Sequence, residues 1–179
     1  MTKQDISKHI LTIQRANSVM IVDIALYGAL TLLFLIVTGS PSATIITGGL
    51  TAILVYGHLQ VKKGSSRGFN WAVMINGMMA AASLWNLWMA RSAPGIRMIT
   101  VVGSVVIISV LFMVIFICGM RAFTNISEKI DIGKTLEVYS ENKNQQKEDK
   151  TYDAKAFRQS VKDGSFEMEL VYKDSFKDM

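Results

Sequence analysis

The sequence predicts an all-α integral membrane protein: a four-helix transmembrane bundle of antiparallel hairpins, with a short N-terminal amphipathic helix and a small, partly disordered cytoplasmic tail. Three observations predict this fold, namely long apolar stretches, polar residues on one face of each stretch, and an abrupt change of composition after Met120. The apolar stretches are residues 19–37, 43–61, 71–90 and 98–120. A helix of about 19 residues is about 28 Å long, close to the hydrocarbon thickness of a bilayer.

Residues 1–18 are expected to form a cytoplasmic or interfacial segment ahead of the first span. Ile6, Ile10 and Ile13 recur at helical spacing, with basic residues between them that are available to anionic lipid headgroups. A short helix lying on the inner leaflet fits this pattern, and so does an extension of the first span. Because the run 19–37 is longer than the core of a signal peptide, we expect the first span to be retained.

Short connections join the apolar stretches. The connections 38–42 and 92–95 contain both prolines of the chain together with glycine and serine, and the connection 64–68 contains glycine and serine. These residues favour tight turns. Consecutive spans should therefore run antiparallel, and residues 19–120 should form one membrane domain.

The charge pattern predicts the orientation of the spans. Lysine and arginine occur in residues 1–18, in residues 62–67 and after Met120, whereas the connection 38–42 has none. Arg91 and Arg97 are a mild exception. By the positive-inside rule, both termini face the cytoplasm of a multi-pass protein in the inner (plasma) membrane. Since the net charge of +5 lies beside the spans rather than across one surface, nucleic acid is not an expected partner.

The tail, residues 121–179, begins where the apolar character ends. Residues 140–151 are rich in charged and amide side chains and are expected to form a flexible linker. Beyond the linker, apolar residues alternate as in a strand, and they are the candidate partner-binding residues: Phe166, Met168, Leu170 and Tyr172. Such a strand could pair with residues 135–139, add to a sheet of another protein, or stay disordered.

The polar residues of each stretch share one face of a helical wheel. Because lipid chains cannot satisfy polar groups, these faces are expected to turn toward protein, either within one bundle or between copies of the chain. The faces comprise Asp23, Tyr27, Thr31 and Thr38; Thr44, Thr47, Gly48, Thr51 and His58; Asn76, Ala80, Ser83 and Asn86; and Thr100, Gly103, Ser104 and Cys118.

Asp23, His58 and Asn76 are expected to share one layer near the cytoplasmic side, because each lies a few residues from that end of its span. An ionisable residue inside a membrane is a candidate functional site. Three roles stay open for this intramembrane polar cluster: interhelical hydrogen bonding, an ion or proton pathway, and contact with a partner.

No pattern of a known chemistry is found. The two histidines, His9 and His58, lie on different segments and form no metal-ligand pair, and Cys118 is the only cysteine. No nucleotide-binding glycine motif or nucleophile elbow occurs. The sequence therefore predicts no catalytic residues, no metal site and no cofactor.

These features favour a non-catalytic accessory or scaffold subunit of a multi-protein envelope complex of the secretion, conjugation or defence type. Its expected partners are the lipid bilayer, membrane or cytoplasmic proteins bound through the tail, and a second copy of the chain. One alternative is an oligomeric ion or proton channel, or a small transporter subunit, in which Asp23 selects or relays cations. Another is a membrane immunity or exclusion protein, which would share every feature named above.

Overall fold

The computed structural model describes residues 3–89 and 96–138. Its elements are α1 (Lys3–Leu33), which continues into the π-helical turn η1 (Phe34–Thr38), then α2 (Pro41–Lys62), α3 (Arg67–Met89) and α4 (Ile96–Ile126). Residues 132–138 are also helical. No strand occurs within these ranges, so the predicted all-helical fold is confirmed.

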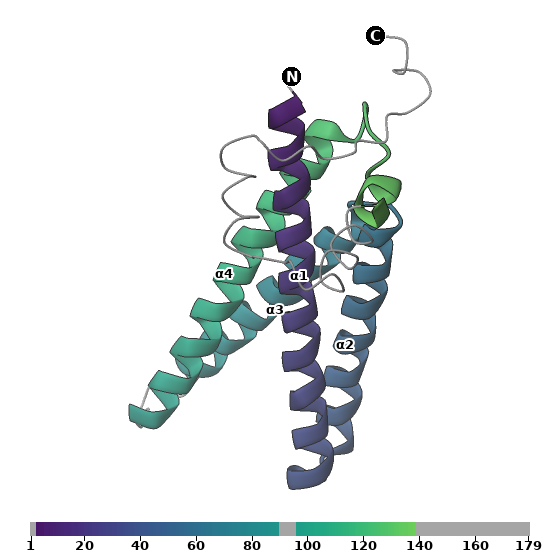
Figure 1. Cartoon of the computed structure of the whole chain (residues 1–179). Coiled ribbons are helices and arrows are strands. Elements are labelled where there is room, and N and C mark those ends of the chain that lie inside the picture. The colour runs from purple at the N-terminus through teal and green to yellow at the C-terminus, as the bar shows by residue number, and fades with distance from the viewer. Residues whose placement is uncertain (1–2, 90–95, 139–179) are drawn as a thin grey trace, which may run out of the picture.

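The four helices lie at the corners of a square when the bundle is viewed along its axis. α1 packs against α2 and α4, and α3 packs against the same two helices, so α1 and α3 lie on a diagonal. Figure 1 shows that the α1–α2 pair and the α3–α4 pair come together at the end carrying the N-terminus and diverge toward the other end. The turn between α1 and α2 uses Gly39 in the left-handed conformation (φ 58°), followed by Pro41 in the first turn of α2.

α1 runs without a break through residue 18, so residues 3–18 extend the first span and do not form a separate interfacial helix. Ile6, Ile10 and Ile13 are at most 4% exposed because they pack into the protein core, not against lipid headgroups. Their neighbours include the end of α4 and the segment after it. At about 1.5–3 kcal/mol for each fully buried isoleucine, this contact outweighs adsorption of a weak apolar stripe to a membrane surface.

Small residues and one aromatic ring bring all four helices together at one level, which we call the glycine layer: Ala16, Gly57, Gly68, Phe69 and Gly119. A methyl group on Gly119 would lie 2.6 Å from the Ala16 Cβ atom and 3.3 Å from the Phe69 ring, and one on Gly68 would overlap the Gly57 carbonyl group. Side chains larger than hydrogen at these glycines would separate the helices. The close approach therefore fixes the register of α1 through α4.

Beyond the glycine layer, toward the N-terminus, lies a packed region that we call the base: residues 3–15, 63–66 and 122–138. Its core contains the three isoleucines of α1 together with Ala122, Phe123, Ile126, Ile130 and Ile132. The segment after α4 folds back onto the turn between α2 and α3. A Cβ atom on Gly64, whose φ of 80° already favours glycine, would lie 3.1 Å from the Gly133 nitrogen.

The surface changes character at the glycine layer. In the described ranges, every exposed large apolar side chain lies on the far side from the base or beside the layer itself: residues 21–37, 45–59, 71–89 and 99–114. The exposed side chains of the base are charged or polar, such as Lys8, Glu128 and Lys129. An apolar band and a hydrophilic end thus meet at this layer.

Three helical segments are long and apolar enough to cross a membrane: Asp5–Val37, Pro41–Lys62 and Ile99–Ile126. α3, which contains the predicted third span, is not among them. Its 23 residues give a length of about 34 Å, but Asn76, Asn86 and three tryptophans make it less apolar than these three segments. The predicted membrane character is therefore confirmed for three helices. A membrane crossing by α3 remains a prediction.

Substitution of Gly119 tests the glycine layer. Gly119→Ala should lower the free energy of unfolding by about 1–3 kcal/mol, because the methyl group must displace Ala16 and the Phe69 ring. Unfolding of the purified protein in detergent, followed by circular dichroism, measures this difference.

Gly103→Ala is the matched control on the same helix, since no atom outside its own helix lies within 4 Å of the added methyl group. It should leave stability unchanged or slightly raised. Equal stability of the two variants would contradict the close approach at Gly119.

Candidate functional site

Asp23 on α1 and Asn76 on α3 form a hydrogen bond across the diagonal of the square. The Asn76 Nδ2 atom donates to Asp23 Oδ2 at 2.7 Å and to the Ala72 carbonyl oxygen at 3.0 Å. Each of the two side chains is only 2% exposed. Within the described ranges, no lysine or arginine forms an ion pair with Asp23. The Asn76 amide is thus the group that compensates burial of this carboxyl group.

His58 does not join this pair. Its Nδ1 atom donates to Asn17 Oδ1 at 2.8 Å, and the side chains are partly buried. Asn17 precedes Asp23 by about 9 Å along α1 and adjoins Ala16, so His58 lies at the glycine layer and not at the level of Asp23. The structure therefore brings together two of the three predicted cluster residues and places the third with a residue that the sequence argument missed.

α1 is consequently hydrogen-bonded to two other helices, to α2 through Asn17 and to α3 through Asp23. Its neighbour α4 contacts it through Gly119 and Ala16. α4 also meets α3 through the Phe69 and Phe116 rings, whose centroids are 6.4 Å apart. The polar pair and the aromatic pair both stabilise the half of the bundle next to the base.

The predicted inward faces of the first three helices are confirmed at Tyr27, Thr47 and Ala80, which are buried. Several hydroxyl groups on these faces bond to their own helix, since Thr31 donates to the Tyr27 carbonyl oxygen and Thr47 to that of Ala43. Such hydroxyl groups need no partner on another helix.

The polar face of the fourth helix does not turn into the bundle of this chain: Thr100, Ser104 and Cys118 are exposed, and so is Asn86 on α3. The Ser104 hydroxyl donates to the Thr100 carbonyl oxygen at 2.8 Å, so it is satisfied while facing outward. α4 instead turns Ser109, Phe116 and Gly119 inward. Packing of small and aromatic groups, rather than polarity, selects this face.

Most of the predicted tail lies outside the described residues, including the linker 140–151 and the candidate partner-binding residues Phe166, Met168, Leu170 and Tyr172. Pairing of the tail strand with residues 135–139, one of the alternatives for the tail, does not fit residues 135–138, which are helical. Thr135 is fully buried, with its hydroxyl group donating to the Asp131 carbonyl oxygen at 2.8 Å. The helix forms here because Asp131 also accepts a hydrogen bond from the Lys134 backbone nitrogen at 3.2 Å, as in a helix cap.

Comparisons with protein-family models, with curated proteins and with solved structures find no match to this chain. In the part of the chain that the structure describes, no group of three or more His, Cys, Asp or Glu side chains could hold a metal ion. At the buried pair, Asp23 and Asn76 form a hydrogen bond between two helices.

Removal of the Asn76 amide tests the buried pair. Asn76→Leu should cost about 1–3 kcal/mol of unfolding free energy, because it leaves the Asp23 carboxyl group buried without its donor. The double variant Asp23→Leu with Asn76→Leu should recover most of that loss, since neither polar group then remains.

Asn86→Leu is the matched control on α3, because Asn86 is exposed and should change stability by less than about 0.5 kcal/mol. Detergent unfolding of the four proteins gives the comparison. If Asn76→Leu behaves like Asn86→Leu, the hydrogen bond across the diagonal does not stabilise the bundle.

Proposed function

We propose that this chain is a non-catalytic, four-span protein of a bacterial-type inner membrane that serves as an accessory or scaffold subunit of a multi-protein envelope complex. Both termini and the base lie in the cytoplasm, and the tail captures a partner. The observation that carries the proposal is the packed base, which joins the membrane helices to the start of that tail.

The glycine layer marks the cytoplasmic boundary of the membrane in this proposal. From the layer to the far ends of the four helices, at Thr38, Pro41, Met89 and Ile96, the rise is about 24–35 Å, which brackets the hydrocarbon thickness of a bilayer. α3 exposes large apolar side chains over the same levels as its neighbours, among them Met74, Met78 and Leu84. These lengths and surfaces support a fourth span despite the lower apolarity of α3.

The base supports a role in binding. Residues 130–138 are held against the turn between α2 and α3 by the contact of Gly133 with Lys63 and Gly64. Figure 1 shows this segment beside the end of α2, at the same end of the molecule as the N-terminus. The polypeptide that follows Val138 therefore starts from a fixed point next to the proposed membrane surface. A partner bound by it would be held close to the bilayer.

Asp23 is the residue on which a transport function would depend. In this chain its carboxyl group is 2% exposed and bonded to Asn76 across the centre of the square. That geometry favours a structural role over a path for ions. We therefore retain the accessory or scaffold function as the proposal.

Reporter fusions test the topology. Fusions at both termini and in the turn at residues 63–66 should report the cytoplasm, whereas fusions in the connections at residues 39–40 and 92–93 should report the opposite side, because four spans alternate. Alkaline phosphatase and green fluorescent protein give opposite signals on the two sides. A cytoplasmic signal at residues 92–93 would show that α3 does not cross the membrane and would contradict the proposal of four spans.

Truncation tests the tail. Deletion of residues 152–179 should abolish copurification of the partner proteins that the full chain brings down from native membranes, as identified by mass spectrometry. Replacement of the alternating residues Phe166, Met168, Leu170 and Tyr172 by serine should give the same loss, because a strand added to a partner reads alternate side chains.

The matched control replaces Glu167 and Glu169, which lie between the alternating residues, and Lys173, which follows them, by serine and should keep the partners. An unchanged set of copurifying proteins after truncation would contradict the proposed role of the tail.

A further inference from the structure

Four exposed basic residues surround the bundle at the level of the glycine layer, one on each helix: Arg15, Lys62, Arg67 and Arg121. We call them the cation ring. Arg15 adjoins Ala16, and Arg67 adjoins Gly68. Arg121 is about 3 Å along its helix from Gly119, and Lys62 is about 8 Å from Gly57. Because the glycine layer fixes these helices in register, the four basic residues lie within about 8 Å of the layer, on the side of the base.

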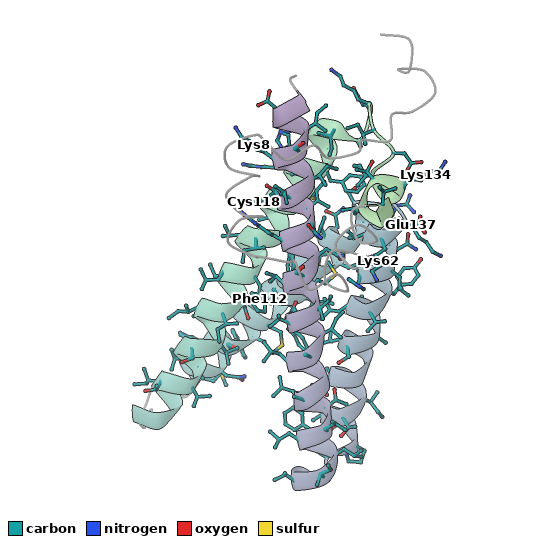
Figure 2. The ribbon with its side chains drawn as sticks, in the orientation of Figure 1. Lys8, Lys62, Phe112, Cys118, Lys134 and Glu137 are labelled. Atoms are coloured by element: carbon teal, nitrogen blue, oxygen red, sulfur yellow. The ribbon has the colours of Figure 1, made fainter. Side chains whose placement is uncertain are left out.

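The ring encircles the molecule and is not confined to one face. Figure 2 shows Lys62 on the α2 side of the bundle and Cys118, which precedes Arg121 by three residues on the same helix, on the α4 side. Arg15 lies on α1 and Arg67 at the start of α3. A ligand that neutralises all four charges must therefore be present around the whole circumference, as the headgroups of a lipid leaflet are.

The described part of the protein offers the four cations no ion-pair partner. Within residues 3–89 and 96–138, Lys134 forms an ion pair with Asp131 at 3.9 Å, and no residue of the cation ring forms one. The 41 residues after Val138 carry eight basic and nine acidic side chains, so the remainder of the chain has almost no net negative charge to offer. An anionic membrane surface is the better charge complement.

The surroundings of the ring match the boundary between headgroups and acyl chains. On one side of it the exposed side chains are large and apolar, such as Ile21, Tyr56 and Trp71, and on the other side they are hydrophilic. Long basic side chains at such a boundary lay their apolar stems on the bundle and extend their charges toward phosphate groups.

We propose that the cation ring binds the headgroups of anionic phospholipids of the inner leaflet, so that the layer of lipid around the bundle is enriched in phosphatidylglycerol-type lipids. This inference rests on the membrane boundary proposed above, but not on the partner-binding role of the tail. Each basic residue near an anionic surface contributes about a fivefold preference, which gives the ring a measurable selectivity.

Cys118 provides the probe, because it is the only cysteine of the chain, is exposed, and adjoins Gly119. The full chain is labelled there with a fluorophore and reconstituted in phosphatidylcholine vesicles. One series of vesicles contains phosphatidylglycerol with a nitroxide on its acyl chain. The other series contains the same mole fraction of phosphatidylcholine with the same label. Quenching by each lipid gives the relative association constant of the two lipids for the protein surface.

We expect stronger quenching by the anionic lipid for the native chain, and weaker selectivity in 1 M salt, where charges are screened beyond about 3 Å. The variant Arg15→Gln with Arg121→Gln should lower the relative association constant by about fivefold or more. The control Lys129→Gln with Lys134→Gln removes the same charge from the base and should leave the constant within about twofold, because its charges lie outside the ring.

Thermal unfolding of both double variants establishes that they are folded as the native chain is. Equal quenching by the two lipids in the native chain, or an equal loss of selectivity in the control variant, would overturn the ring as a lipid site. Absence of quenching by either lipid would instead place Cys118 away from the bilayer and overturn the proposed membrane boundary itself.

Discussion

The close approach of the four helices at the glycine layer is the constraint on which the rest of this structure depends. Helices in a membrane gain little from burying apolar side chains, because lipid is as apolar as the protein interior, so close packing of backbones has to stabilise their association. Gly57, Gly68 and Gly119 permit that packing. The resulting register brings Asp23 opposite Asn76 and Asn17 opposite His58. Without the layer, neither hydrogen bond would have its partner at hydrogen-bonding distance.

The molecule is stabilised by different physics on the two sides of this layer. In the base, isoleucine and phenylalanine side chains such as Ile10, Ile126 and Phe123 form a buried core of the kind found in soluble helical proteins. In the apolar band, the polar pair and a few buried side chains such as Met20, Leu54 and Phe116 join the helices, and many other large apolar side chains face outward. The base therefore closes one end of the bundle while the helix pairs diverge toward the other (Figure 1).

Much of the helical architecture could be predicted from the sequence, whereas the extent of α1 could not be inferred from hydropathy alone. The charged residues at its start lower the hydropathy of the segment. The buried residues nevertheless form one continuous stripe along α1, with the spacing of three and four that is typical of a packed helix: residues 6, 10, 13, 16, 20, 23 and 27. On α4, serine and threonine gave a misleading signal because their hydroxyl groups bond to their own helix. The partner of His58 was missed because Asn17 was assigned to a segment outside the span.

By itself, the amino-acid sequence determined that the described chain is helical, that three helices can cross a membrane, and that Asp23 and Asn76 face the protein interior. These properties follow from helix period, helix length and the cost of exposing amide and carboxyl groups to lipid. Only the tertiary structure decided which helices lie on the diagonal, where the glycines meet, and that residues 130–138 return to the turn between α2 and α3. These features depend on the relative rotation and register of separate helices, which close packing of particular side chains sets and local periodicity does not encode.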